Sequence, residues 1–298
     1  MTTAQYRVID IASRNEESFE LSQGEYDNFQ KAQAVILKII DLEEVYDQTI
    51  ESFFDYRNMI NYWSLRSITI PFGNHKINHE IRGSLNKLAF NVLNLGKLYL
   101  DKHYNVDKRT CFSSDLNKSE EIKNDIKLHR CKIYNENIRY VIGCKLRSSS
   151  QHNLFPVQSF STTLKRIPKS DKGQISFGIK VNHEKLKNIG IPDNKIDADC
   201  EYDLTDILSG YIYGISEMHH YNRKLYFDKL SESKEIISRL MIYYSNKSEY
   251  SDYYCVVIED TGKMLNANLD WTELVDYLQE KHPFSVDYSA SFHEPLKI

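Results

Sequence analysis

The feature that most constrains the fold is an unbroken helical pattern early in the chain. Between residues 25 and about 63, apolar residues recur at steps of three and four or their sums, with no proline or glycine among them. This spacing places apolar side chains along one face of a helix. It predicts one long helix, or two with a slight break, packed into a helical bundle; a coiled coil would need charged flanks along the whole seam. The apolar positions are Phe29, Ala32, Ile36, Ile39, Tyr46, Ile50, Phe53 and Ile60.

Further helices are predicted downstream, so the fold class is mainly α. The same periodicity marks residues 77–103, 138–152 and 204–244. Ser119 followed by two glutamates is typical of a helix start, with a capping side chain and early acidic residues that suit the helix dipole. Gly96, inside the second of these helices, permits a close approach by a neighbouring element.

Strand-like segments interrupt the helices in two places. Residues 159–182 alternate β-tolerant residues around a Pro-Lys-Ser-Asp-Lys-Gly turn, which predicts an inserted β-hairpin. The tail combines a strand-like stretch at 253–258 with a short helix near 271–279, so we expect a small α/β appendage. These boundaries predict a helical domain over residues 1–245 that contains the hairpin, and a C-terminal extension over residues 246–298.

Cysteine and hydropathy patterns indicate a protein without disulfides or membrane spans. The five cysteines are odd in number and form no Cys-x-x-Cys pair, so neither a disulfide framework nor a zinc knuckle is supported. There is no signal-peptide core and no apolar run of about 18 residues, so we expect a cytoplasmic protein with no membrane contact. Carboxylates alternate over residues 197–203 as in a calcium loop, but the glycine and terminal glutamate of such a loop are missing. We expect neither a metal nor another cofactor.

The stretch richest in chemistry runs from residue 138 to residue 157. Arg147 is followed five positions later by His152, at the end of a predicted helix that Asn153 can terminate and Pro156 prevents from resuming. Arginine presents a planar fork of donors that fits phosphate oxygens. Histidine titrates near neutral pH and can exchange a proton with a ribose 2′-hydroxyl or a leaving oxygen. The pair therefore suits phosphodiester chemistry.

The spacing of this pair sets a geometric condition on any shared site. At about 100° per residue, a five-residue step leaves the two side chains roughly 140° apart on an ideal helix. Either the helix unwinds near Asn153, or another segment or another protomer completes the site. The alternative interpretation is a solvated helix end without catalytic function.

Residues on both sides of the pair extend the pattern. They are Tyr134-Asn135, Arg139-Tyr140, Leu146-Arg147 and Gln151-His152, with Ile81-Arg82, Leu85-Asn86, Leu88, Val92-Leu93 and Leu100-Asp101 upstream. This combination resembles the HEPN-domain superfamily of helical proteins, which is commonly marked by Arg-x4-6-His. The resemblance covers about residues 25–245, and its specific part is 134–157. It implies a HEPN-type helical bundle and a metal-independent ribonuclease of toxin–antitoxin, CRISPR-associated or anti-phage systems, in which the motif helices of two protomers face each other as a homodimer.

On this resemblance, Arg147 would hold the scissile phosphate and His152 would serve as acid or base. The family usually has Asn, Asp or His directly after the arginine, whereas this chain has Ser148, which can still donate a hydrogen bond. We therefore predict Arg147, His152 and Ser148 as catalytic residues. The predicted substrate-binding residues are Lys145, Gln151, Lys165 and Arg166.

The charge distribution allows RNA binding only through a local surface. The 298-residue chain has a formal net charge of −4, which argues against a protein that coats nucleic acid by bulk electrostatics. Residues 161–190, however, hold seven lysines or arginines against Asp171 and Glu184. A basic hairpin beside the motif could guide an RNA backbone, because phosphate contacts supply much of the affinity for RNA. A solvated surface hairpin is the alternative.

Three functions are compatible with these residues. The first is a HEPN-type endoribonuclease of a prokaryotic toxin or anti-phage defence system, which leaves a 2′,3′-cyclic phosphate and a 5′-hydroxyl and is restrained by an inhibitory or sensor partner protein or by an autoinhibited form. The second is a catalytically inactive HEPN-like module that binds RNA, a nucleotide or a protein, an interpretation that Ser148 and the modest net charge favour. The third is a structural helical subunit in which Arg147 and His152 only contribute to packing.

Overall fold

The computed structural model describes residues 5–10, 18–70, 74–152, 155–196, 202–245, 254–258, 261–267 and 270–290. In these ranges the chain is mainly helical with small antiparallel sheets, as predicted. It divides into two compact units. Unit 1 comprises Met1–Glu44, Asp115–Lys118 and Arg223–Pro283, and unit 2 comprises Val45–Ser114, Ser119–Asn222 and Phe284–Ile298. The long helices α1 (Gln23–Arg66) and α7 (Leu204–Ser245) each contribute residues to both units.

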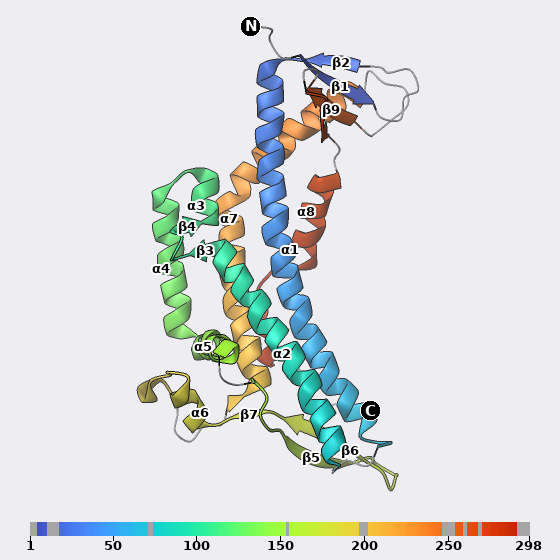
Figure 1. Cartoon of the computed structure of the whole chain (residues 1–298), viewed down its shortest axis with the longest axis vertical. Helices are drawn as coiled ribbons and strands as arrows, with labels where there is room; N and C mark the ends of the chain where they lie inside the picture. Colours follow the sequence, from blue (N-terminus) through green and yellow to red (C-terminus); the bar gives the residue numbers. More distant parts are fainter. Residues whose placement is uncertain are drawn as a thin grey trace. The chain divides into compact units, whose positions relative to one another are not determined.

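Unit 1 contains a four-stranded antiparallel sheet, in the order β10-β9-β1-β2, whose strands come from the N-terminal and C-terminal parts of the sequence (Figure 1). β1 pairs with β9 from Tyr6 opposite Ile258 to Asp10 opposite Tyr254. We had expected a domain boundary near residue 245. The two units do not meet there, because the C-terminal strands β9 and β10 share a sheet with the N-terminal strands. The elements are β1 (Tyr6–Asp10), β2 (Ser18–Leu21), β9 (Tyr254–Ile258), β10 (Lys263–Asn266) and helix α8 (Asp270–Lys281).

The start of α1 is fixed within unit 1 by a capping box. The Ser22 hydroxyl accepts from the Glu25 amide at 3.3 Å, and the Glu25 carboxylate accepts from the Ser22 amide at 2.9 Å. The two residues thus satisfy each other's backbone donors at the first turn. The Ser22 hydroxyl also donates to the Glu25 carboxylate at 2.6 Å, and this bond, together with the one from the Ser22 amide, lowers the pKa of Glu25 because both stabilise its charged form. The Tyr26 ring stacks on Tyr6 of β1, with ring centroids 4.1 Å apart.

Unit 2 holds most of the remaining helices and three short antiparallel ladders (Figure 1). The β5–β6 hairpin lies where the sequence predicted one. The helices are α2 (His75–His103), α4 (Glu120–Glu136), α5 (Ile138–His152) and α6 (His183–Asn188), while α3 (Phe112–Asn117) has residues in both units. The ladders pair β3 (Tyr104–Asn105) with β4 (Thr110–Cys111), β5 (Ser161–Arg166) with β6 (Gly173–Gly178), and β7 (Lys180–Val181) with β8 (Tyr202–Asp203). Short 3-10 helices cover Asp193–Lys195 and Tyr288–Ala290.

Side-chain caps set the ends of the helices around α5. Ser119 accepts from the Ile122 amide and begins α4, as predicted. Asn137 separates α4 from α5: its amide donates to Ile133 O, and its side-chain oxygen accepts from the Tyr140 amide at 3.0 Å. The Asn137 side-chain amide also donates to Gly210 O of α7 at 2.9 Å. One residue therefore ends α4, begins α5 and fixes α5 against α7.

Glycines let α2, α5 and α7 approach closely. A Cβ added at Gly143 of α5 would lie 2.7 Å from the Tyr211 ring of α7, and one added at Gly96 of α2 would lie 2.8 Å from Tyr211 Cζ. Tyr211 is thus wedged between glycines on two helices, and its hydroxyl donates to Leu93 O at 3.3 Å. A Cβ at Gly214 of α7 would lie 2.7 Å from the Tyr140 ring of α5. The close approach predicted at Gly96 is confirmed.

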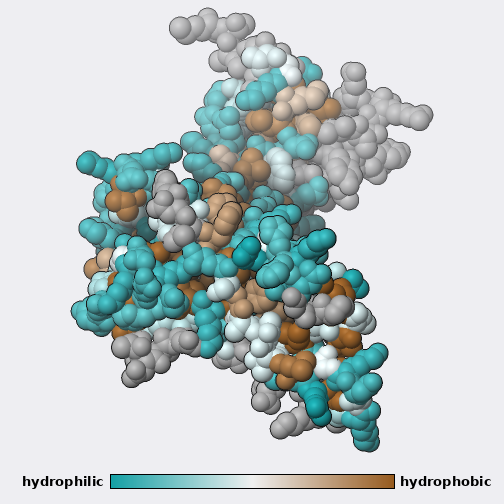
Figure 2. All heavy atoms as spheres, turned by 60° about the horizontal axis from the view of Figure 1, so that its bottom comes forward, coloured by the Kyte–Doolittle hydropathy of each residue, from teal (hydrophilic) through white to brown (hydrophobic). Residues whose placement is uncertain are grey.

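The surface drawn in Figure 2 is mostly hydrophilic, and its hydrophobic residues occur in small separate groups. Isolated apolar residues are ordinary on protein surfaces. None of the helices in the described ranges has both the length and the apolarity required to cross a bilayer.

Candidate functional site

Arg147 lies in the C-terminal half of α5, where it lines a cavity of about 280 Å³ in unit 2. The residue is half-buried, and its Nε is buried without a hydrogen-bond partner among the described residues. A buried guanidinium nitrogen without a partner costs free energy, so a ligand that reached this atom would offset that cost with a hydrogen bond. The described lining residues are Lys97, Leu100, Asp101, Tyr104, Asn105, Val106, Asp107, Arg130, Tyr134, Tyr140, Cys144, Arg147, Ser148 and Tyr211.

The other cations of the cavity have protein partners. Lys97 pairs with Asp101, one turn away on α2. Arg130 of α4 donates from Nη1 to Tyr104 O at 2.9 Å, and its guanidinium carbon lies 4.7 Å from the centroid of the Tyr104 ring. Backbone and ring together hold Arg130 in one orientation. Arg147 is therefore the cation of this lining whose donors are most available to an anion.

Tyrosines form the walls of the cavity. Tyr140 and Tyr211 stack with centroids 5.9 Å apart, and burial raises the pKa of both hydroxyls, so they stay neutral at pH 7. Tyr104 and Tyr134 also line an adjoining cavity of about 380 Å³, which shares five lining residues with the first. Tyr134 is exposed, and Lys195 Nζ lies 5.4 Å from its ring centroid. The two cavities thus present tyrosine rings next to cationic groups.

Two α5 side chains of the cavity have restricted chemistry. Burial raises the pKa of the Cys144 thiol to about 11, so it remains protonated and is a poor nucleophile. The Ser148 hydroxyl donates to Cys144 O, one turn back along the helix, at 3.3 Å. Ser148 lines the cavity as predicted, but its proton is directed to the helix backbone in this arrangement.

The other residues predicted on α5 are placed differently from Arg147. His152 is the last residue of α5, and its side chain lies outside the described part of the chain, as does Asn153. Gln151 is exposed in the final turn. Lys145 Nζ lies 3.9 Å from the position that a Cβ on Gly190 would occupy, beyond the end of α6. Neither Lys145 nor Gln151 is among the described residues that line the Arg147 cavity.

The hairpin that carries Lys165 and Arg166 is attached to the C-terminal end of α1. Ser64 Oγ donates to Ile175 O at 2.7 Å, and the Ile175 amide donates to Ser67 Oγ at 2.8 Å. Lys165 and Arg166 are both exposed on β5. The structure therefore presents them as part of a solvated hairpin, and they are not among the described lining residues of the Arg147 cavity.

The attachment of the hairpin lies far from the Arg147 cavity, as positions along α2 show. Trp63, next to the hairpin contacts on α1, donates from Nε1 to Ser84 Oγ of α2 at 2.9 Å. Lys97 of the cavity lies 13 positions further along α2, which is about 20 Å at the rise of an α-helix. Guidance of RNA from the hairpin to Arg147 would have to span roughly this distance.

The sequence did not predict that α4 completes the cavity opposite α5: Arg130 was not singled out, and Tyr134 was named only as part of the motif run. Arg130 and Tyr134 stand four positions apart on α4, so they share one helix face. The sequence shows this spacing. Whether that face of α4 lies toward α5 depends on the turn that Asn137 makes between the two helices. Lys97 comes from α2, and Tyr104 comes from β3, the strand that follows α2.

Another polar cluster lies in unit 1 and not at the cavity. Arg223 of α7 donates to the buried Glu43 carboxylate of α1 through Nε at 2.8 Å and Nη2 at 2.6 Å. Arg223 also donates from Nη1 to His282 O at 2.5 Å. Tyr226 donates a further hydrogen bond to the same carboxylate. This arrangement is a buried ion pair that fixes α7 against α1 within the unit.

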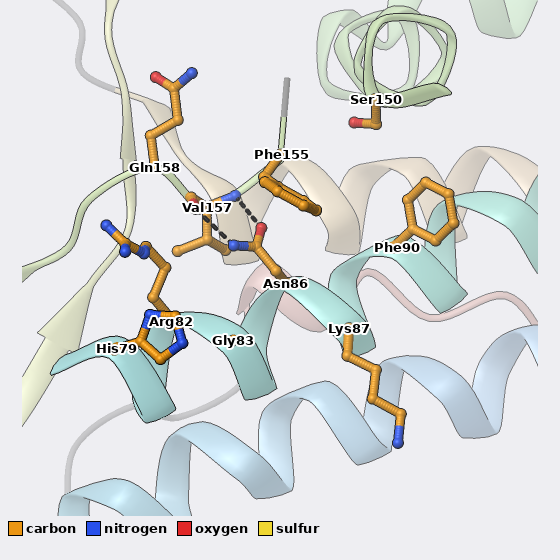
Figure 3. A pocket seen from close by; sticks show the side chains of 10 residues that line it. All are labelled: His79, Arg82, Gly83, Asn86, Lys87, Phe90, Ser150, Phe155, Val157 and Gln158. Carbon is orange, nitrogen blue, oxygen red and sulfur yellow. Dashed lines mark hydrogen bonds between the residues drawn. The ribbon is translucent and has the colours of Figure 1, made fainter. Parts of the chain in front are cut away.

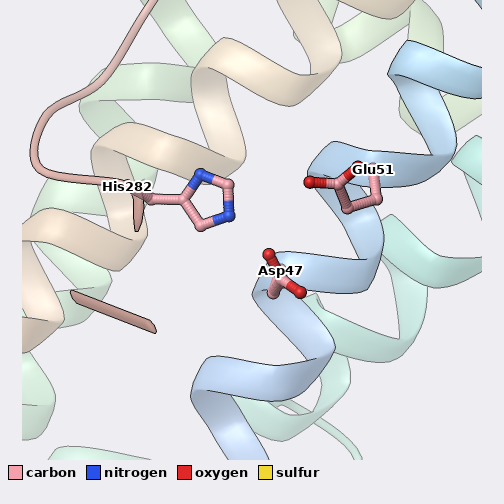
Figure 4. A group of neighbouring side chains, drawn as sticks. All are labelled: Asp47, Glu51 and His282. Atoms are coloured by element: carbon pink, nitrogen blue, oxygen red, sulfur yellow. The ribbon is translucent and has the colours of Figure 1, made fainter. Parts of the chain in front are cut away.

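Two carboxylates one turn apart on α1, Asp47 and Glu51, point to the same side of the helix in unit 2 (Figure 4). Both are half-buried. Carboxylate pairs at this spacing are common on helix surfaces without any bound ligand, and we assign them no function.

Comparisons of the chain with models of protein families, with curated proteins and with solved structures found no match. The chemistry of the site therefore rests on the residues described above.

Proposed function

We propose that the protein is a HEPN-type, metal-independent endoribonuclease whose Arg147 cavity holds a phosphate of RNA, in a prokaryotic toxin or anti-phage defence system. The observation that carries this proposal is the half-buried Arg147, whose Nε has no hydrogen-bond partner among the described residues and which lines a cavity walled by tyrosines. A charge-assisted hydrogen bond to a phosphate oxygen would satisfy that nitrogen. The neighbouring tyrosine rings suit the bases of single-stranded RNA, which stack on aromatic side chains.

In this proposal His152 supplies the proton transfers. A base removes the proton of the ribose 2′-hydroxyl, the 2′-oxygen attacks phosphorus, and the 5′-oxygen leaves after receiving a proton from an acid. The products are a 2′,3′-cyclic phosphate and a 5′-hydroxyl. A single imidazole would have to perform both transfers, whereas two facing copies of the motif would provide one imidazole for each. The roughly 140° between Arg147 and His152 on an ideal helix also favours a site shared between protomers of a homodimer.

A second candidate function is binding of RNA or a nucleotide without cleavage. The specific observation in its favour is that Ser148, the residue directly after the arginine, donates its hydroxyl proton to Cys144 O at 3.3 Å and so does not present it to the cavity. The described lining offers cations, two aspartates and tyrosine rings, and the cations and rings suit recognition of a phosphate and a base. Ser148, with its hydroxyl bonded to Cys144 O, adds no acid or base.

The deciding experiment incubates the purified full chain with labelled single-stranded RNA in EDTA. We expect cleavage that is abolished by Arg147→Ala and by His152→Ala. Arg239→Ala, which removes an exposed arginine of α7, and His75→Ala, which removes an exposed histidine of α2, serve as matched controls. Circular dichroism checks that each variant is folded.

Each outcome of this experiment separates the candidates. Binding that Arg147→Ala weakens, without cleavage by the parent chain, would support the binding module. Cleavage that survives His152→Ala would refute the mechanism. If Arg147→Ala changed neither cleavage nor affinity relative to Arg239→Ala, both candidates would fail.

A mixing experiment tests the shared site. If each site takes Arg147 from one protomer and His152 from the other, dimers formed from the two inactive variants contain one intact site. Random exchange of equal amounts should then restore about a quarter of the parent activity, because half of the dimers are mixed. No recovery, despite exchange shown by native mass spectrometry, would exclude sites that pair one Arg147 with one His152 across the interface, and would leave either both residues in one protomer or one site that needs both imidazoles.

A further inference from the structure

A second cavity of unit 2, of about 680 Å³, lies beside the N-terminal half of α2 (Figure 3). It is bounded by α2, by Ser150 near the end of α5, and by the segment 155–158 that follows α5. Phe90 and Phe155 are its aromatic residues, and in Figure 3 they surround one open space together with Ser150. This space has no part in the Arg147 cavity, whose described lining residues are all different.

The backbone that carries Phe155 is held from two sides. Asn86 of α2 donates from its side-chain nitrogen to Val157 O at 2.7 Å and accepts from the Val157 amide, also at 2.7 Å. Lys185 of α6 donates from Nζ to Pro156 O at 2.9 Å. Val157 itself is buried. The segment is therefore fixed at the two residues directly after Phe155.

Phe155 is nevertheless 71% exposed. A large aromatic ring that remains in water on a fixed backbone is not contributing to the core. The backbone of Phe155 is preorganised. Binding of a ligand that stacks on this ring therefore costs little conformational entropy of the protein. Phe90, which is half-buried, forms a second apolar surface in the same space.

The charges around the space favour an anionic ligand. His79, Arg82 and Lys87 are among the described lining residues, and none of the described lining residues is acidic. In Figure 3 the Arg82 side chain lies on the side of Val157 and Gln158, whereas Lys87 points away from the rings. Arg82 is thus the cation best placed to meet a phosphate next to a group stacked on Phe155.

We propose that this cavity binds a nucleobase of single-stranded RNA, stacked on Phe155, with Arg82 at a neighbouring phosphate. The inference rests on the proposed function in taking RNA as the ligand. Ser150 lies three residues beyond Arg147 on α5, about 4.5 Å along the helix axis. One RNA strand passing the end of α5 can therefore place a phosphate at Arg147 and a base against Phe155.

The test measures binding of a fluorescein-labelled RNA of about ten nucleotides with 2′-fluoro riboses, which lacks the 2′-hydroxyl needed for cleavage. We expect Phe155→Ala to weaken binding by about 5- to 150-fold, as for loss of one stacked base. Phe155→Trp should retain binding, and its emission should be quenched when RNA is added. Phe284→Ala removes a phenylalanine of unit 2 that is 67% exposed and lines neither cavity, so it should leave the affinity unchanged.

A second pair of variants tests the phosphate contact. Arg82→Ala should weaken binding and reduce its salt dependence, whereas Lys76→Ala, which removes an exposed cation from the first turn of the same helix, should not. If Phe155→Ala and Phe284→Ala bind equally well while Arg147→Ala binds weakly, the second cavity is not a base site although the proposed function stands. If Phe155→Ala weakens binding while Arg147→Ala does not, the base site stands and the proposed function fails.

Discussion

Replacing Gly96 with alanine tests how tightly α2, α5 and α7 pack beside the Arg147 cavity. The added Cβ would collide with Tyr211 Cε1 and lie 2.8 Å from Tyr211 Cζ and from Ile215 Cδ1. Non-bonded carbon atoms prefer separations of about 3.5–4.0 Å, so the ring or the helix would have to move by roughly 1 Å. Tyr211 has little freedom to move, because Gly143 contacts its other side and its hydroxyl donates to Leu93 O.

The size of the effect follows from two opposing contributions. Overpacking a well-filled core costs about 1–3 kcal/mol, whereas alanine is more favourable than glycine inside a helix by about 1 kcal/mol. Gly83 provides the matched control, since it lies in the same helix and a Cβ there would meet nothing within 4 Å. Gly83→Ala should therefore stabilise the protein. The difference in unfolding free energy between the two variants then reports the overpacking cost alone, about 1–3 kcal/mol.

Urea denaturation followed by circular dichroism measures both variants and the parent. A double variant adds a second check, because Gly96→Ala should cost less when Tyr211→Leu has already removed the ring. Because Tyr211 lines the cavity, Gly96→Ala should also weaken RNA binding. Gly83 lines the second cavity, so Gly83→Ala is the control for stability only. Equal stability of Gly96→Ala and Gly83→Ala would refute the close packing of the three helices.

Three further predictions concern buried polar groups. Arg223→Ala removes the guanidinium paired with buried Glu43 and should lower the free energy of unfolding by about 3–5 kcal/mol in urea denaturation; a loss under about 1 kcal/mol would contradict a buried pair. Asn86→Ala leaves the Val157 amide and carbonyl without their side-chain partner and should cost about 1–3 kcal/mol, with faster hydrogen exchange at Val157; unchanged exchange would contradict the clamp. Burial depresses the pKa of His103 to about 3, so its contribution to stability is present above about pH 6.5 and lost as the pH falls toward 3, with a slope of at most about 1.4 kcal/mol per pH unit. His103→Phe should flatten this pH dependence, and an unchanged slope would show that His103 is not its source.

Local sequence patterns predicted the helices well because local interactions determine where those helices begin and end. The apolar spacing over residues 25–63 is realised in α1, and the Ser119 cap begins α4. Gly96 marked a close helix approach because only a missing side chain permits one. The pairing of β1 with β9 joins residues more than 240 positions apart, and no local pattern in either strand specifies that partner. We expected a domain boundary near residue 245 because the sequence did not reveal this pairing.

The cavity shows the same division between local and distant information. The spacing of α5 singled out Arg147 and Ser148, which share the cavity. It did not reveal that Arg130 and Tyr134 of α4 complete the cavity, because their contribution depends on the turn that Asn137 makes between α4 and α5. Lys165 and Arg166 were grouped with the motif by charge alone, and the structure attaches their hairpin to α1. Charge patterns identify surfaces, but the packing of elements decides which surfaces meet.

The energetics of Arg147 connect the fold to the proposed ligand. A buried donor without a partner costs about 1–3 kcal/mol, and an aliphatic side chain at position 147 would fill the same wall without that cost. Leu100 and Tyr211 already supply apolar and aromatic surface there. Packing therefore gives no reason for a guanidinium at this position, whereas a phosphate would offset the cost through charge-assisted hydrogen bonds. It follows that Arg147→Met, which keeps an unbranched side chain and removes the donors, should leave the RNA-free protein at least as stable as the parent while removing the stabilisation that RNA confers.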